Sequence, residues 1–397
     1  MKKLLFFLIG LYLGASELVI YNDLAFVKEK LKVDRGIIAP LPRSIIADSL
    51  YVPGVKYYSF HTGGLDQKVL LRSLLGKKVR FVHRKKELVG TLKSYDPIII
   101  QGEKRVYFDV YFNDLIFTNL SISPFPYIQT NLQNGKADIA YLMRQISWRA
   151  SYVAKINKKL ALQGFMHITN NSGKEFKDSA ITLIAGDIAR ARRVMPLKMT
   201  KALMDSNAIA PQSIQGYYRY DLPGKWDLKK SQYIAFMQER LDYSNLYEVS
   251  FYNVLYTNTT LKQKCNRYIL FRSSKPLPRG TIRFYTQDIF LGEGVLKNIA
   301  PKEQVKMLLG KDFDLVAKRY TLHLQRDKKR IAAKVRYEVR NPKPKAVDVV
   351  VKERIAGDNL QIHSEKNYSK ENGNIAFHLH IPSQSSIIWE AEYILLK

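Results

Sequence analysis

Three histidines in the C-terminal part of the chain have the spacing of metal ligands. His378 and His380 lie two residues apart, so both point to the same face of an expected strand. His323 is the candidate third ligand, because a zinc site takes three or four protein ligands. The other face of that strand, between Ile375 and Ile381, is apolar and indicates the core. We therefore expect the histidines to face solvent, and the sequence predicts no metal and no other cofactor.

Two basic clusters could bind an anion. The first comprises Lys77, Lys78, Arg80, Arg84, Lys85 and Lys86, and the second comprises Arg190, Arg192 and Arg193. The whole chain has 64 Lys and Arg against 35 Asp and Glu, a formal charge of +29. Such a charge favours an anionic partner. The alternative is that these side chains are solvated strand surface that aids solubility and protects sheet edges.

Aromatic residues follow the first basic cluster, as they do in some nucleic-acid-binding barrels. They are Tyr107, Phe108, Tyr111, Phe112 and Phe117. A stacking platform requires aromatic side chains on one exposed face, whereas these fall both in and out of register along the chain. We therefore expect them to fill a core, and we expect no nucleic-acid partner.

Recognisable catalytic motifs are missing from the sequence. It contains no G-x-S-x-G, H-E-x-x-H, P-loop or G-x-G-x-x-G pattern. The single cysteine, Cys265, cannot form an intrachain disulfide and lies in a strand-like segment, so we interpret it as a half-buried thiol. The sequence favours a binding or scaffold protein over an enzyme. Two alternatives stay open: an envelope hydrolase with a site of dispersed Asp, Glu and His residues between domains, and an assembly subunit that pairs through a free strand edge.

The N-terminus has the pattern of a secretory signal peptide. Two lysines precede an apolar run from Leu4 to Leu13, followed by Gly14, Ala15 and Ser16. We expect cleavage after Ser16, a mature chain without a transmembrane segment, and a location in the periplasm or cell envelope. The expected anionic partner is therefore an envelope component, namely lipid, lipopolysaccharide or wall polymer, or an envelope protein, and a peripheral membrane contact is compatible with this.

Most of the chain alternates polar and apolar residues with period two, which predicts an all-β, multi-domain protein. After the signal peptide (1–16), we expect an N-terminal β region (17–126) containing a small β-barrel at about 67–123. A middle β domain (127–280) would carry a basic, flexible insertion at about 187–214. Seven strand-like segments from residue 281 to 397 suggest an immunoglobulin-like C-terminal β-sandwich.

Several segments resemble a family of bacterial exported proteins that includes the mucoidy-inhibitor-like proteins. The similar segments include ISWRASYVAKI, MHITNNSGKEFKDSAITLIAGDI, LPRGTIRFYTQD and YEVRNPKPKAVDVVVKERI, within residues 128–397, and the opening strand LVIYNDLAFVKEKLKV. The resemblance implies the fold of that family's C-terminal domain, and it implies no catalytic residues. Members of the mucoidy-inhibitor-like group have a long coiled coil after the first strands, whereas this chain has the expected small barrel and no sustained heptads.

Overall fold

The computed structural model describes residues 16–64, 67–117, 123–186, 211–214, 216–252, 254–355 and 359–396. Strands dominate this part of the chain, which confirms the all-β prediction. Helix within it is confined to α1 (Gln67–Ser73) and two 3-10 turns, η1 (Ala47–Ser49) and η2 (Phe112–Asp114). The expected signal sequence lies outside the described residues except for Ser16, and so does most of the expected flexible insertion, residues 187–210.

The strands bury the residues that period-two alternation predicts. In β24 (Arg330–Asn341), Val335, Tyr337 and Val339 are fully buried, whereas Arg336 and Arg340 between them are exposed. Successive side chains of a strand point to opposite faces, so each strand presents one apolar face to a core.

The first β-sandwich consists of two packed sheets. The ten-stranded sheet has the order β15 (Pro211–Ile214), β16 (Tyr217–Asp221), β14 (Phe176–Ala185), β1 (Glu17–Ile20), β2 (Ala25–Asp34), β3 (Ile37–Ile38), β10 (Tyr127–Thr130) and β4 (Tyr58–His61), with β11 (Gly135–Met143) paired to β2 and β17 (Trp226–Leu228) paired to β14. The five-stranded sheet has the order β18 (Ser231–Leu241), β13 (Leu160–Asn170), β12 (Ile146–Ile156), β21 (Gly280–Thr286) and β22 (Ile289–Leu296).

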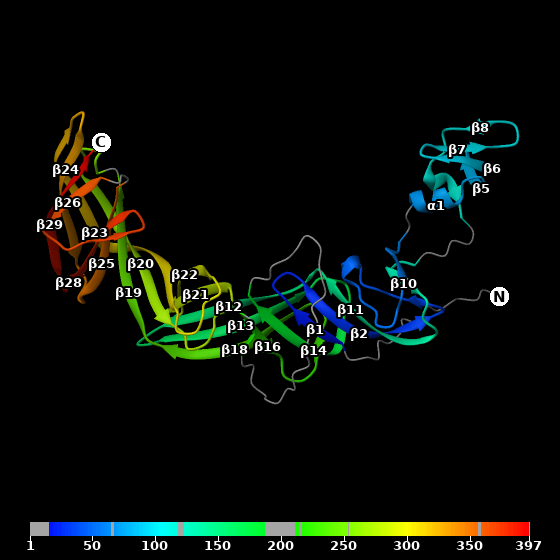
Figure 1. Ribbon diagram of the computed structural model, residues 1–397, viewed down its shortest axis with the longest axis horizontal. Helices are drawn as coiled ribbons and strands as arrows, with labels where there is room; N and C mark the ends of the chain where they lie inside the picture. Colours follow the sequence, from blue (N-terminus) through cyan, green and yellow to red (C-terminus); the bar gives the residue numbers. More distant parts are fainter. Residues whose placement is uncertain are drawn as a thin grey trace.

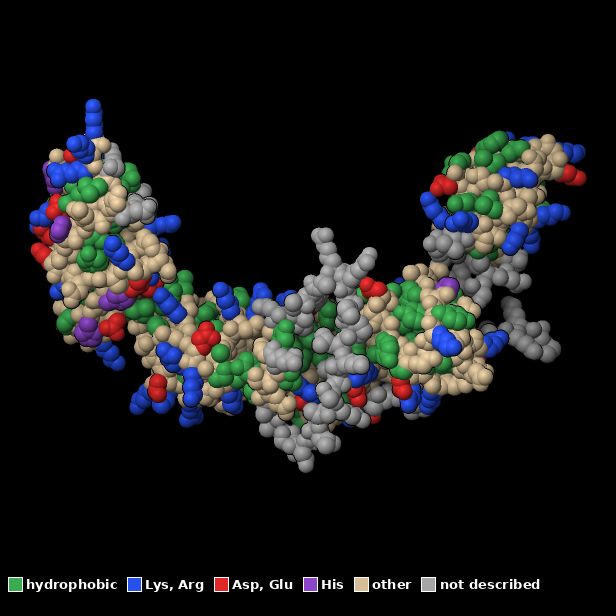
Figure 2. All heavy atoms as spheres, in the orientation of Figure 1, with side chains coloured by type: hydrophobic (Ala, Val, Ile, Leu, Met, Phe, Trp, Pro, Cys, Tyr) green, Lys and Arg blue, Asp and Glu red, His purple; other side chains and the backbone are tan. Residues whose placement is uncertain are grey.

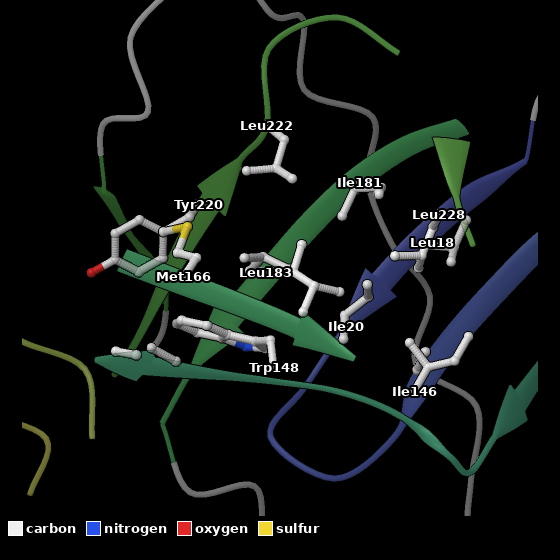
Figure 3. Close-up of a cluster of buried hydrophobic side chains, with 14 of the residues drawn as sticks. Leu18, Ile20, Ile146, Trp148, Met166, Ile181, Leu183, Tyr220, Leu222 and Leu228 are labelled. Atoms are coloured by element: carbon white, nitrogen blue, oxygen red, sulfur yellow. The ribbon is translucent and has the colours of Figure 1, made fainter. Parts of the chain in front are cut away.

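The core of this sandwich lies between the two sheets. Figure 3 shows Ile20, Met166 and Leu183 pointing toward one another from β1, β13 and β14, beside the Trp148 ring from β12. Trp148 also donates from Nε1 to the Ile184 carbonyl, 3.0 Å away in the opposite sheet. This bond satisfies the polar group of a side chain that is otherwise buried among apolar atoms.

The second β-sandwich is formed by one curled nine-stranded sheet. Its order is β26 (Leu360–Ser364), β29 (Ser385–Leu396), β24, β23 (Gln304–Arg326), β20 (Leu261–Arg272), β19 (Tyr243–Tyr252), β25 (Val347–Arg354), β28 (Asn374–Ile381) and β27 (Ser369–Glu371). Tyr337 of β24 stacks on Trp389 of β29 at 4.9 Å between ring centroids, and lies 5.7 Å from Phe377 of β28. The two halves of the curled sheet thus pack against each other around one core.

The two sandwiches repeat the same topology. In the second, seven strands run β29-β24-β23-β20-β19-β25-β28, and only the β19–β25 pair among them is parallel. In the first, the corresponding path is β18-β13-β12/β11-β2-β1-β14-β16, and only β1–β14 is parallel. β11 and β12 follow each other with two residues between them, so together they correspond to the single long strand β23.

A matching buried asparagine marks both copies. Asn170 ends β13 and donates from Nδ2 to the carbonyl of Lys174, while Asn341 ends β24 and donates from Nδ2 to the carbonyl of Lys345, four residues later in each case. Each side-chain oxygen also accepts a hydrogen bond from the backbone N–H two residues on. At each corner the chain crosses from one layer of the sandwich to the other, so we interpret the protein as an internal duplication.

The expected small barrel is an open sheet rather than a closed barrel. Its order is β8 (Val106–Tyr107), β7 (Ile98–Gln101), β6 (Lys86–Tyr95), β5 (Lys78–His83) and β9 (Leu115–Ile116). The edge strands β8 and β9 have two residues each and do not pair with each other, so the sheet does not close. This small domain is inserted between β4 and β10, and it lies at the end of the arc-shaped molecule opposite to the second sandwich (Figure 1).

Sheet pairing differs from the sequence-based expectation at three places. The segments at 280–286 and 289–296, expected in the C-terminal sandwich, are β21 and β22 and belong to the first sandwich, because β21 pairs in parallel with β12. β19 and β20, expected in the middle domain, belong to the second sandwich. Residues 211–214, at the end of the expected flexible insertion, form β15 and pair with β16. Local alternation identifies a strand but carries no information about its distant partner.

Candidate functional site

The β5–β6 hairpin of the small domain exposes three consecutive cations at its turn. Val79 and Phe81 of β5 are buried in the domain core, which orients the hairpin. Arg84 and Lys85 form the two-residue turn with φ of 50° and 67°, the left-handed conformation typical of tight hairpins, and Lys86 begins β6. All three side chains are exposed.

A second segment holds two aromatic residues near this turn. The His83 ring, next to Arg84, bonds through Nε2 to both carboxylate oxygens of Asp109 at 3.1 and 3.0 Å. Asp109 lies in the loop after β8, and its neighbours Phe108 and Tyr111 are 69% and 74% exposed. We call Arg84, Lys85, Lys86, Phe108 and Tyr111 the tip. Figure 2 shows cationic and hydrophobic side chains together on the surface of the small domain.

The electrostatics of the tip are positive. The hydrogen bond from His83 lowers the pKa of Asp109, with smaller contributions from its own backbone and from the charges of His83 and Arg84. Within the described parts of the chain, no carboxylate forms an ion pair with Arg84, Lys85 or Lys86. The small domain, residues 67–117, has eleven Lys and Arg against five Asp and Glu. The tip therefore presents a positive field beside apolar rings.

The remaining predicted basic residues lie elsewhere. Lys77 and Lys78 lie at the opposite end of β5, five residue steps or roughly 17 Å from the turn. Arg80 forms an ion pair with Glu87 on the neighbouring strand. Arg190, Arg192 and Arg193 lie outside the described residues.

Sequence reasoning missed the exposed aromatic pair. Tyr107 is buried, and Phe112 and Phe117 pack against the domain core, as expected. Phe108 and Tyr111 are exposed instead. The available signal was Asp109 between them, because an unpaired acid is seldom placed inside an apolar core.

The candidate metal-binding histidines each bond to a carboxylate of a neighbouring strand. His380 Nδ1 lies 2.7 Å from Asp348 Oδ1, and His378 Nε2 lies 2.8 Å from Glu371 Oε1. His323 lies on β23, separated from β28 by β20, β19 and β25 in the sheet order, so the structure does not bring the three together. Over the described ranges, no three His, Cys, Asp or Glu side chains are grouped to hold a metal ion.

A hollow of about 940 Å³ lies where β18 of the first sandwich meets β19 of the second. Its Glu239 carboxylate accepts hydrogen bonds from the hydroxyls of Ser273, at 2.5 Å, and Ser274. Arg272 and Lys302 also line it, and the described residues of its lining include no histidine or cysteine. Because Glu239 joins the end of the first sandwich to the segment that follows β20, we interpret this cluster as a clamp between the two sandwiches.

Buried charges elsewhere have structural partners. In the second sandwich, Arg319 bonds to Glu353 at 2.7 Å, and the Tyr337 hydroxyl donates to the same carboxylate at 2.8 Å. In the first, Lys174 Nζ lies 2.5 Å from Glu29. Burial raises the pKa of the Cys265 thiol to about 12, so this cysteine stays protonated and unreactive at neutral pH.

A comparison with family models identifies the larger part of the chain. The model described as Domain of unknown function (DUF4139) matches residues 137–386, which extend from β11 into β29. No curated protein matches the chain. None of the helices in the described ranges is long and apolar enough to cross a membrane.

Proposed function

This chain belongs to the family that shares the Domain of unknown function (DUF4139), and from that premise we propose that it is an exported, non-catalytic binding protein whose tip attaches to a phosphate-bearing anionic component of the bacterial cell envelope. The observation that carries the proposal is the tip itself: its three cations form no ion pair with a carboxylate of the described residues, and the loop bonded to the adjoining His83 carries two exposed aromatic residues. Phosphate groups attract such cations, and aromatic rings favour the boundary between headgroups and acyl chains.

The shape of the molecule suits this role. The small domain projects from the first sandwich at one end of the arc, and the second sandwich lies at the other end (Figure 1). The Arg84–Lys86 turn is held by a hairpin whose strands are anchored in the domain core. Rigid presentation reduces the conformational entropy that binding would otherwise cost.

The proposal of export rests on the N-terminal sequence. Lys2, Lys3 and the apolar run from Leu4 have the signal-peptide pattern. β1 begins at Glu17, the first residue after the expected cleavage site, so cleavage there would keep all of β1 and would remove the bond that the Ser16 carbonyl accepts from the Ala180 N–H at 2.9 Å. The resemblance to the mucoidy-inhibitor-like proteins supports an envelope location as well. We do not extend it to control of exopolysaccharide, because the small domain stands where those proteins have a coiled coil.

The hydrolase alternative has less support. The 940 Å³ hollow contains Glu239 and Asp242, but Glu239 is already bonded to two serines and Asp242 lies 3.2 Å from Lys159. A general acid or base must have a free position for a substrate proton. We therefore assign these carboxylates to the junction.

The test is co-sedimentation of the mature chain, residues 17–397, with four separate probes across a salt series. The probes are phosphatidylglycerol vesicles, phosphatidylcholine vesicles, lipopolysaccharide and a phosphate-free acidic wall polymer. We expect binding to the phosphate-bearing anionic probes that weakens as salt shortens the screening length. Preference between the vesicles and lipopolysaccharide would identify the source of the phosphate. Equal binding to phosphatidylcholine, or binding to none of the probes, would overturn the proposal.

A further inference from the structure

The internal duplication makes the strand edges of the two sandwiches comparable. In the first sandwich, β12 pairs with β13 on one side and with β21 on the other, in parallel, from Ala150 opposite Gly280 to Lys155 opposite Tyr285. β21 comes from the segment that connects β20 to β23, so this edge of the first sandwich is covered by a strand from beyond its own repeat.

The corresponding edge of the second sandwich has no paired strand among the described residues. The end of β23 pairs with β24 on one side, from Tyr320 opposite Arg336 to Arg326 opposite Ile331. On the other side, pairing with β20 ends at Arg319 opposite Leu261. Beyond Arg319, no strand from the described ranges pairs with this side of β23. The turn before β20 lies against its first residues, where the Thr321 hydroxyl donates to the carbonyls of Thr257 at 3.3 Å and Thr259 at 3.4 Å, and the pairing with β24 shifts register between Thr321 and His323. A strand edge without a paired neighbour can accept an added strand.

The side chains around this edge indicate which kind of strand would fit. Leu322 is 43% exposed, and Tyr256, in the turn before β20, is 59% exposed, with the Arg326 guanidinium carbon 5.7 Å from its ring centroid. The turn that follows β23 adds Lys328 and Lys329, which form no ion pairs with carboxylates of the described chain. The edge therefore combines apolar contact area with a surplus of positive charge.

We propose that the open edge of β23, residues 320–326, binds an extended acidic segment of another protein, which adds as a parallel strand in the way that β21 adds to β12. A second copy of this chain is a poor occupant, because its formal charge of +29 repels and its own β21 is already paired. The edge lies at the opposite end of the arc from the tip (Figure 1), so the inference is independent of the proposed function. Together, the two sites would allow the protein to link an envelope surface to a protein partner.

The test uses the full mature chain and three synthetic peptides. The first has the β21 sequence from Arg279 to Gln287, and the second carries Arg279→Glu and Arg283→Glu in that sequence. The third is the acidic peptide with methyl groups on alternate backbone nitrogens, which removes ladder hydrogen bonds. Fluorescence anisotropy gives the affinity, and hydrogen exchange read by mass spectrometry locates the binding site.

We expect the acidic peptide to protect amides of residues 320–326, to bind roughly tenfold more tightly than the basic one, and to lose binding on N-methylation. In the variant Arg326→Glu/Lys328→Glu the preference between the two peptides should reverse, and unchanged exchange in β24 would show that the variant is folded. A variant in which the tip residues Arg84, Lys85 and Lys86 are replaced should bind the peptides normally. Failure of the proposal for the tip can therefore be distinguished from failure of the proposal for the β23 edge. No protection, protection confined to other strands such as β18 or β22, or no preference for the acidic peptide would refute the proposal.

Discussion

Neutralising the tip should weaken attachment to anionic vesicles much more than the same loss of charge elsewhere. The perturbation is Arg84→Asn/Lys85→Asn/Lys86→Gln, in which asparagine is chosen because it tolerates the positive φ of the first two positions. Each cation near an anionic membrane contributes about 1 kcal/mol, and none of these three is paired with a carboxylate of the described chain. The triple variant should therefore lose about 3 kcal/mol, or roughly 150-fold in affinity.

The matched control is Lys328→Gln/Lys329→Gln/Lys366→Gln. It removes the same charge from exposed sites of the second sandwich. Co-sedimentation with phosphatidylglycerol vesicles at low salt should show near-normal binding of the control, and the difference between the variants should shrink as salt rises, because exposed charges are screened. Equal weakening by both variants would mean that net charge alone drives binding, and normal binding of the tip variant would refute the role of the tip.

Three further predictions concern stability and ionisation. Arg319→Met should lower the free energy of unfolding, measured in urea, by about 3 to 5 kcal/mol, because it leaves the Glu353 carboxylate buried without its cation. The double variant Arg319→Met/Glu353→Leu should recover part of this loss, and a double variant less stable than Arg319→Met would contradict the reasoning. Asn341→Ala should cost about 2 to 3 kcal/mol by calorimetry, since it leaves buried carbonyls at the corner unpaired, and a change within error would show that water replaces the amide. By NMR titration, Asp109 should have a pKa below its ordinary 3.8, because the His83 bond favours the ionised carboxylate. The stabilisation of the folded state by this carboxylate is present above pH 3.8 and is lost as the pH falls through the lowered pKa of Asp109 in the folded protein. If His83→Ala does not raise the titration midpoint of Asp109, the bond is not the cause.

Much of the fold follows from local patterns that are visible in the sequence. Alternation in 330–341 identified both the strand and its buried face, because successive side chains of an extended chain point in opposite directions. The glycine and asparagine residues of the Asn171–Gly173 run lie in the connection between β13 and β14, and the basic run at 84–86 lies at a hairpin turn. These features depend on neighbours within a few residues, which the sequence shows directly.

Only the tertiary structure decided which strands became partners and which side chains met. The parallel pairing of β12 with β21 joins residues about 130 positions apart, and period-two alternation is the same whichever strand lies alongside. The bond between His83 and Asp109, next to the exposed Phe108, joins a loop to a strand that precedes it by more than twenty residues. The separation of His323 from His378 follows from the strand order of the second sandwich. Composition and alternation thus determined an all-β, basic chain. Strand order, which is set by long-range packing, decided the position of the tip. It also paired β12 of the first sandwich with β21 and left the end of β23 in the second sandwich without a strand on the corresponding side.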